Sequence, residues 1–312
     1  MKNKLNYIVW TSGYKECSGG VVVRQKLCDL LNRAGETAFL LPLKKYRRVR
    51  SVKNSNICHE NYATNPTYKT PLLPRDFNLE DKNNVIIYSD AETGNPVGLD
   101  NVVRWIALYD RGIPRISSTW KNSDLKILYS KLFKSDIEGN PINFRVESET
   151  ISIWETQVKF FKDLGQKRNG NCFAIRKGVA NRQRILNSPE AARYTNPKDV
   201  EIYSGKKLTN QYMLETFNKY KRFYSYDSET YLSTIAALCG CESVIVPDPT
   251  KRKQDILAQE NYKHGVAYGL EDLDRANETR IKFRLDLEEL EKQNIINVEK
   301  FVKITYDKFM VN

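Results

Sequence analysis

The polar residues between positions 225 and 230 have the types and spacing of a phosphate-binding turn. They lead into a helix expected over residues 230–238, and they are Ser225, Tyr226, Asp227, Ser228, Glu229 and Thr230. The first turn of a helix carries backbone N–H groups without partners and the positive end of the helix dipole, which suits a diphosphate. Ala236, Ala237 and Gly240 let this helix lie close to a strand expected over residues 243–246.

Two consecutive cations, Arg176 and Lys177, follow a strand expected over residues 172–175. Open α/β sheets bind ligands beyond the carboxyl ends of their strands. Paired cations at that place can neutralise a departing diphosphate without a metal ion. The alternative is that both side chains are solvated surface charges.

Two glycines, Gly19 and Gly20, lie in the loop between a strand expected over residues 5–10 and a helix expected over residues 21–33. Glycines there let a ligand approach the backbone and the helix N-terminus. The loop lacks the GxGxxG pattern, so a dinucleotide site is disfavoured. A tight turn without a ligand is the alternative.

Two carboxylates, Asp90 and Glu92, come directly after a buried strand expected over residues 84–88. A carboxylate at this edge can accept a proton from an acceptor hydroxyl or hold a sugar, and the alternative is turn and capping duty. Asn95 precedes Pro96, where the chain turns toward the next element. His59 is a second candidate base, whereas a structural role is favoured for His264.

No metal site is predicted. The six cysteines are scattered without metal-ligand spacing and are expected to be buried small residues, and the chain has only two histidines. No cofactor is expected either.

The formal net charge of +12 calls for an anionic partner. Its densest cluster lies within residues 44–53, where an anionic membrane face, a lipid-linked or glycan acceptor, or mere solvation would explain it. Nucleic acid is an unlikely partner because no recognised binding module accompanies the cluster. Since no membrane span or signal peptide is evident, we expect a cytoplasmic protein, with peripheral binding to the inner membrane face as an extension.

Alternation of strand-like and helix-like segments predicts two α/β units. In the first, further strands are expected over residues 37–41, 125–129 and 143–146, and a helix over residues 101–109. In the second, strands are expected over residues 198–203 and 222–226, a helix over residues 210–219, and helices over residues 271–310. The break falls near residues 154–166.

Five segments, in order, resemble a bacterial family of GT-B glycosyltransferases from surface-polysaccharide and lipopolysaccharide clusters. They are SGGVVVRQKLCDLLNRAGETAFL, GNPVGLDNVVRW, CFAIRKG, YSYDSETYLSTIAALCGCESVIVP and HGVAYGLEDLDRANETR. The resemblance covers the chain from about Tyr7 to about Phe301. It implies an α/β fold of two Rossmann-like domains with a ligand cleft between them: residues 1–155 on the acceptor side, residues 156–290 for the nucleotide sugar, and a C-terminal helix, residues 291–312, near the junction.

The same resemblance implies a transferase in which the nucleotide sugar is a co-substrate and a glycan or glycolipid is the acceptor. On the donor side it implies Gly19, Gly20, Arg176, Lys177, Tyr224, Ser225, Tyr226, Asp227, Glu229 and Thr230. Asp90, Arg176 and Lys177 are the expected catalytic residues, with no metal, and Glu92, Asn95 and His59 belong to the acceptor side.

One position departs from the family pattern. Many GT-B enzymes carry a ribose-binding Glu five residues before the helix-ending glycine, where this chain has Ile235. The departure supports the alternative of a non-catalytic glycan- or nucleotide-binding protein on the same fold.

Overall fold

The computed structural model describes residues 4–16, 18–43, 53, 56–107, 113–130, 149–175, 182–194, 196–202, 208–228, 230–248 and 251–310. The chain divides into two compact units. Unit 1 comprises Met1–Glu155 and Lys292–Asn312, and unit 2 comprises Thr156–Glu291.

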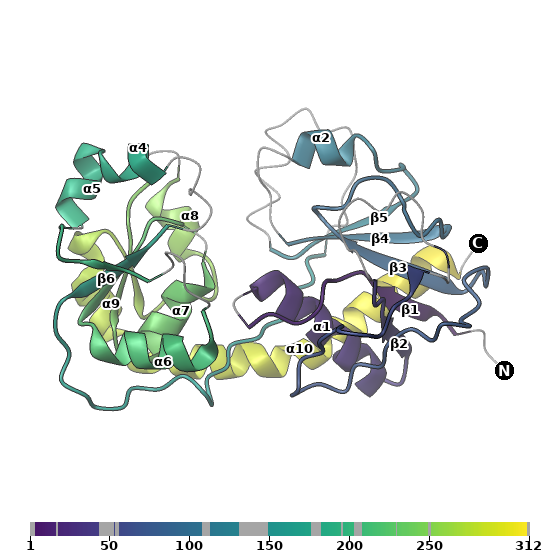
Figure 1. Ribbon diagram of the computed structural model, residues 1–312, viewed down its shortest axis with the longest axis horizontal. Coiled ribbons are helices and arrows are strands. Elements are labelled where there is room, and N and C mark those ends of the chain that lie inside the picture. The colour runs from purple at the N-terminus through teal and green to yellow at the C-terminus, as the bar shows by residue number, and fades with distance from the viewer. Residues whose placement is uncertain are drawn as a thin grey trace. The chain divides into compact units, whose positions relative to one another are not determined.

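Unit 1 is built on a parallel sheet of five strands in the order β2-β1-β3-β4-β5 (Figure 1). A parallel sheet is covered on both faces, so its central strands contain nearly continuous apolar runs instead of an alternating pattern. Its elements are β1 (Asn6–Val9), α1 (Gly19–Arg33), β2 (Thr37–Leu40), β3 (Asn84–Ser89), β4 (Asn101–Ile106), α2 (Ile113–Ser117) and β5 (Leu125–Leu128).

The two faces of this sheet are covered differently. Leu27 and Leu31 of α1, with Val298 and Phe301 of the C-terminal helix, pack on one face. The other face is covered by irregular segments, whose buried side chains include Leu43, Ile57, Leu73, Val97 and Leu99. The described residues between β2 and β3 thus contribute Leu43, Ile57 and Leu73 to the core.

Unit 2 is built on a second parallel sheet of five strands, in the order β10-β9-β8-β6-β7. Counted along the chain within each unit, both sheets have their second strand at one edge, followed by the first, third, fourth and fifth. The elements of unit 2 are β6 (Asn171–Ala174), α4 (Arg182–Leu186), α5 (Pro189–Tyr194), β7 (Val200–Glu201), α6 (Asn210–Lys219), β8 (Arg222–Ser225), α7 (Tyr231–Leu238), β9 (Glu242–Ile245), α8 (Lys253–Leu257), β10 (Val266–Tyr268), η3 (Leu270–Asp272) and α9 (Leu273–Glu278).

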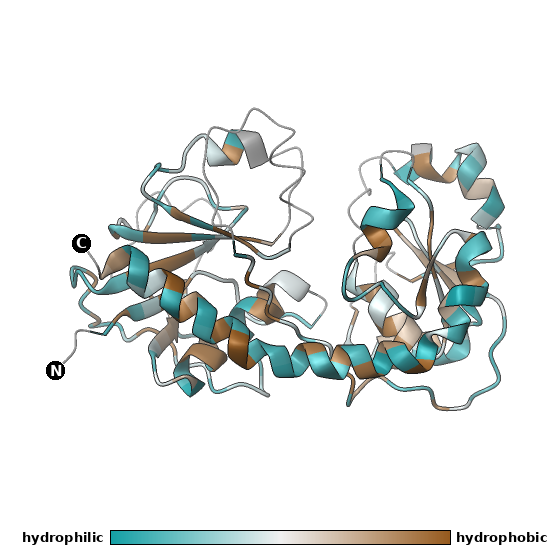
Figure 2. Cartoon of the chain, turned by 180° about the vertical axis from the view of Figure 1, so that it is seen from behind, coloured by the Kyte–Doolittle hydropathy of each residue, from teal (hydrophilic) through white to brown (hydrophobic). Residues whose placement is uncertain are grey.

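A last helix, α10 (Arg280–Phe309), belongs to both units, because the boundary between them falls after Glu291. Figure 2 shows apolar colour concentrated on the strands, while α10 alternates between polar and apolar turns. Within the described part of the chain, no helix combines the length and apolar character needed to cross a membrane.

The predicted α/β class with two Rossmann-like units is confirmed, and most strands fall within a residue or two of their expected positions. The helix predicted over residues 101–109 is wrong, because residues 101–106 form strand β4. Val102, Val103 and Ile106 sit in a strand buried on both faces, where a continuous apolar run looks the same as a buried helix. The strand expected over residues 143–146 lies outside the described residues.

Candidate functional site

Each of the two sheets has its own position at which a ligand is expected. Where the strand order reverses, the chain leaves two neighbouring strands toward opposite faces, and a crevice opens at their carboxyl ends. That place lies between β1 and β3 in unit 1 and between β6 and β8 in unit 2.

In unit 2, the segment after β8 is fixed by its own polar groups. The Ser225 hydroxyl donates a hydrogen bond to the Asp227 carbonyl at 2.7 Å, and the Tyr226 amide donates to the Ala174 carbonyl at the end of β6 at 3.1 Å. Ser225 and Asp227 are both buried. The turn is therefore held against the neighbouring strand at the crevice.

Helix α7 begins at the end of this turn with a side-chain cap. The Thr230 hydroxyl accepts a hydrogen bond from the Leu232 amide at 3.3 Å. The Tyr262 hydroxyl accepts from the Thr230 amide and donates to the Thr230 carbonyl, each at 2.7 Å. The predicted N-terminus at Thr230 is confirmed, and its cap is clamped from a distant part of the chain.

Sequence reasoning missed Tyr262. The residue is 1% exposed and lies 32 positions from Thr230. No local spacing pattern connects the two, so only the fold reveals the contact.

The tyrosines predicted at this edge take different positions. The Tyr224 ring is buried in the core of unit 2, with its centroid 5.8 Å from that of Tyr194. Tyr226 is partly exposed, and its hydroxyl donates to the Ala191 carbonyl of α5 at 3.5 Å. Ile235 of α7 is fully buried, so the position where many GT-B enzymes carry Glu faces the core here.

Arg176, Lys177 and Glu229 lie outside the described residues, and so does the basic cluster over residues 44–50. Their predicted roles stay predictions.

In unit 1, α1 begins without a side-chain cap at Ser18. A Cβ on Gly19 would meet no atom within 4 Å, whereas one on Gly20 would lie 3.5 Å from the Arg24 guanidinium. Arg24 also donates to the Thr11 hydroxyl, at 3.4 Å. The first turn of α1 therefore combines open space at Gly19 with a cation one turn further along the helix.

Three predicted residues of unit 1 have structural partners. Asp90 accepts a hydrogen bond from the Ala107 amide at 3.1 Å, which joins the ends of β3 and β4. Asn95 accepts from the Tyr88 hydroxyl at 2.9 Å and donates to the Leu99 carbonyl at 2.7 Å. His59 contacts the Leu73 carbonyl through Nε2 at 2.8 Å.

Glu92 differs from these residues because its carboxyl group is partly buried and has a shifted pKa. Burial raises the pKa of this carboxyl above its ordinary value, while the neighbouring Trp10 side chain and the positive charge of Arg104 oppose the rise. The Trp120 indole donates to the backbone carbonyl of Glu92 at 2.9 Å. Such a carboxyl can exchange a proton nearer neutral pH than an exposed one.

Arg104 of β4 is a charged residue that sequence reasoning missed. Its side chain is 1% exposed and pairs with Asp124, with 2.9 Å between Nε and the carboxylate. Burial lowers the pKa of Arg104, and the charge of Asp124 acts against that change. A sequence signal was present, since Arg104 interrupts an otherwise apolar strand.

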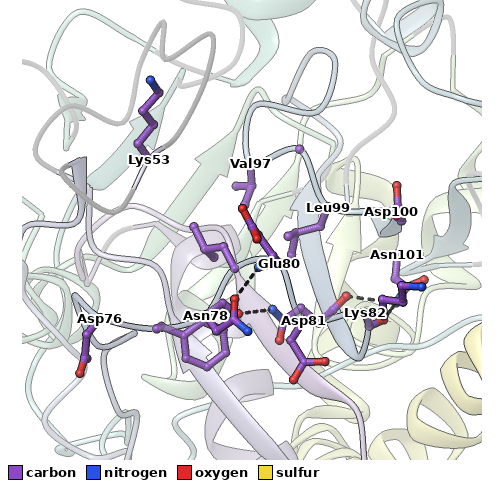
Figure 3. A pocket seen from close by; sticks show the side chains of 14 residues that line it. Lys53, Asp76, Asn78, Glu80, Asp81, Lys82, Val97, Leu99, Asp100 and Asn101 are labelled. Carbon is purple, nitrogen blue, oxygen red and sulfur yellow. Dashed lines mark hydrogen bonds between the residues drawn. The ribbon is translucent and has the colours of Figure 1, made fainter.

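Unit 1 also contains a cavity of about 620 Å³ away from this edge (Figure 3). It is lined by residues at the amino ends of β3 and β4, including Asn84 and Asn101, and by Asp76, Asn78 and Asp81 from the preceding loop. Asn78 and Asp81 accept hydrogen bonds from the amides of Glu80 and Asn83. The cavity lies at the opposite end of the strands from Glu92.

The described residues contain no group of three or more His, Cys, Asp or Glu side chains that could hold a metal ion. His264 contacts the Asp286 carboxylate through Nδ1. Cys28, Cys172, Cys239 and Cys241 are buried as predicted, and Cys58 is partly exposed.

No protein-family model matches the chain, and no curated protein sequence matches it. Several solved structures are similar in fold. An alpha-glucosyltransferase in complex with UDP and a 13-mer DNA containing an HMU base is 12% identical with a TM-score of 0.46, over 99% of this chain and 100% of that one.

T4 phage BGT in complex with UDP-glucose is 10% identical with a TM-score of 0.49, over 98% and 99% of the two chains. The glycosyltransferase SnogD from Streptomyces nogalater is 8% identical with a TM-score of 0.38, over 97% and 100%. At these values the similarity assigns no role to any residue of this chain.

Proposed function

We propose that this protein is a glycosyltransferase of the GT-B type that moves a sugar from a nucleotide-sugar donor to a hydroxyl group of an acceptor. The observation that carries the proposal is the turn from β8 to α7 in unit 2. It places the capped N-terminus of α7 and the buried polar residues Ser225 and Asp227 at the switch point of a parallel sheet.

In this proposal unit 2 binds the donor. The N-terminus of α7 receives the diphosphate, and Arg176 and Lys177, which follow β6 in the sequence, offset the negative charge that develops on it as the sugar leaves. Tyr226 and Asp227 line the nucleotide side.

Unit 1 serves the acceptor. A carboxylate after β3 takes the proton of the acceptor hydroxyl, and the candidates are Asp90 and Glu92. The Asp90 carboxylate already accepts the Ala107 amide, whereas the partly buried Glu92 carboxyl has a raised pKa, so Glu92 is the better candidate on this geometry.

For the acceptor we propose a glycan or glycolipid of surface-polysaccharide or lipopolysaccharide synthesis, used in the cytoplasm at the inner membrane face. The net charge of +12 supports an anionic acceptor. The same charge also suits DNA, which the similar alpha-glucosyltransferase carries, so nucleic acid is the second acceptor class. Changing Lys44, Lys45, Arg47, Arg48 and Arg50 to Gln should weaken acceptor use and leave donor affinity unchanged.

We further propose that transfer needs no metal ion. One structure of T4 phage BGT contains UDP and Mn²⁺, so the assay compares EDTA with added Mn²⁺. Activity that disappears with EDTA and returns with Mn²⁺ would overturn this part of the proposal.

The test of the function begins with a thermal-shift screen of UDP, GDP, ADP and CMP, because a ligand of the native state raises the melting temperature by mass action. The matching nucleotide sugars are then incubated with the protein, and release of the nucleotide is measured. If a nucleotide binds and is released from its nucleotide sugar, the protein is supported as a transferase. If it binds but is not released with any acceptor, a non-catalytic protein is supported. If no nucleotide binds, the proposed donor site is rejected.

A further inference from the structure

The guanidinium group of Arg104 makes contacts at every side in the interior of unit 1. Nε donates to Asp124 at 2.9 Å, Nη1 donates to the Glu92 carbonyl at 3.4 Å, and Nη2 donates to the Gly94 carbonyl. The group also lies over the Tyr88 ring, 4.7 Å from its centroid, and over the Trp120 ring at 5.3 Å. Arg104 is therefore fixed in one orientation.

The same contacts fix the chain that follows β3. The carbonyl of Glu92 receives hydrogen bonds from Arg104 and from Trp120, and the amide of Gly94 donates to the Thr119 hydroxyl at 2.7 Å. The backbone on both sides of Glu92 is thus held by side chains from β4 and from the segment after α2. Trp10, which follows β1, acts on the Glu92 carboxyl as well.

We infer that Arg104 is a positioning residue that holds Glu92, through its backbone carbonyl and through its charge, where the carboxyl can serve the acceptor hydroxyl. The inference rests on the proposed function where it gives Glu92 that task. The geometric part, that Arg104 fixes the backbone at Glu92, stands on the contacts alone, and the effect on titration follows from the positive charge of Arg104.

Among the residues that the structure describes, three titratable side chains near Glu92 bear on its charge: Arg104, Tyr88 and Asp124. Arg104 of β4 favours the ionised carboxyl, while Tyr88 of β3 is neutral in the working pH range because burial raises its pKa. Asp124, before β5, acts mainly on Arg104. Removing the charge of Arg104 therefore raises the pKa of Glu92 further.

The raised pKa of Glu92 also determines how this residue makes the stability of the fold depend on pH. A carboxyl whose pKa is higher in the folded protein binds more protons there than in the unfolded chain, so its contribution is present at low pH and is lost as pH rises through the folded pKa. Glu92→Gln should remove this loss and flatten the dependence of stability on pH.

The test is an NMR titration of the full chain with isotope-labelled glutamate carboxyl groups, in which Glu92→Gln identifies the Glu92 signal. Arg104→Met should move its titration midpoint to higher pH, and Arg104→Lys should leave the midpoint near that of the unchanged protein. An unchanged midpoint in Arg104→Met overturns the inference. Because this readout uses no substrate, it does not depend on the proposed function.

A second variant covers the case in which Arg104→Met fails to fold. Trp120→Phe removes one donor to the Glu92 carbonyl and leaves both charges of the Arg104 pair, so the Glu92 signal should shift or broaden. Arg222→Met is the matched control, since Arg222 also pairs with a carboxylate, Glu242, on a neighbouring parallel strand. A Glu92 signal that is unaffected by Trp120→Phe, or that responds equally to Arg222→Met, contradicts positioning by the Arg104 contacts.

Measurements of kcat and KM then distinguish a role of Arg104 in positioning Glu92 from a role in substrate binding. Arg104→Lys keeps the charge but loses the forked contact to two carbonyls, so kcat should fall by roughly tenfold to a hundredfold with KM almost unchanged. A rise in KM with unchanged kcat would overturn the positioning role. If the NMR shift occurs and no donor is turned over, the proposed function fails while the control of Glu92 by Arg104 stands.

Discussion

The two units share one strand order but end their switch-point strands in different ways. In unit 1 the space after β3 is filled by large buried side chains, with Arg104 and Trp120 holding the Glu92 backbone. In unit 2 the turn after β8 carries polar residues, among them Ser225 and Asp227, and leads into the capped helix α7. The edge of the unit 1 sheet thus holds Glu92 in place, and the edge of the unit 2 sheet carries the N-terminus of α7.

This difference suits two different chemical tasks. A proton acceptor needs one carboxyl held in a fixed place and a tuned environment, which buried aromatic and charged neighbours supply. A diphosphate is favoured by the positive end of a helix dipole with polar side chains beside it, which the start of a helix supplies. The same topology can therefore furnish a donor side and an acceptor side through the residues at its strand ends.

The largest expected effect is on the stability of unit 1. Asp124→Asn leaves the Arg104 charge buried without its partner and should cost about 3–5 kcal/mol. All four tryptophans, at positions 10, 105, 120 and 154, belong to unit 1, so tryptophan fluorescence during urea unfolding follows this unit alone. Glu242→Gln in unit 2 breaks a more exposed ion pair and should lower the free energy of unfolding by at most about 1 kcal/mol. Unfolding of this variant is measured by circular dichroism. Equal losses would remove the contrast between the two units.

The next effect concerns the donor side. Arg176→Ala and Lys177→Ala should each weaken transition-state stabilisation by about 2–4 kcal/mol, because the developing charge on the diphosphate then lacks a charge-assisted contact. Turnover of the nucleotide sugar measures the loss, and an unchanged melting temperature shows that the fold is intact. Rates close to those of the unchanged protein in both variants would exclude these residues from the site.

Sequence reasoning found helix α7 and its neighbouring strand because their signals are local. Thr230, Ala236 and Gly240 mark the start, the packed side and the end of one helix, and each signal depends only on neighbouring residues. The continuous apolar run of β4 was misinterpreted as a helix, because periodicity does not separate a buried strand from a buried helix.

The contacts that fix the site depend on distant residues, and the sequence does not pair them. Tyr262 reaches Thr230 across 32 positions, and Trp120 reaches Glu92 across 28. Asp90 and Glu92 looked equivalent as carboxylates after a strand. Only the fold shows that the Asp90 carboxylate holds the Ala107 amide while the carboxyl of Glu92 lies beside Trp10.

A smaller effect is expected at the clamp of α7. Tyr262→Phe removes the hydroxyl that serves both the amide and the carbonyl of Thr230, and leaving these buried groups unpaired should cost about 1–3 kcal/mol. Nucleotide affinity should fall with it if the N-terminus of α7 binds the diphosphate. Tyr212→Phe, in a partly exposed position on α6, is the control. Loss of stability with unchanged nucleotide affinity would separate the clamp from the donor site.

The smallest effect on stability, and the sharpest test of the comparison, is expected at Gly19. A Cβ at this position meets no atom within 4 Å, and the residue begins helix α1 with a φ that is not positive. Gly19→Ala should therefore leave the fold intact or stabilise it by up to about 1 kcal/mol.

Gly265→Ala is the contrasting control. The φ of Gly265 is +67° and a Cβ there would lie 2.7 Å from the Phe283 ring, so this variant should destabilise unit 2. If substrate lies against the open first turn of α1, Gly19→Ala weakens donor or acceptor binding in a titration without lowering the melting temperature. Unchanged affinity for both would exclude the first turn of α1 from the site.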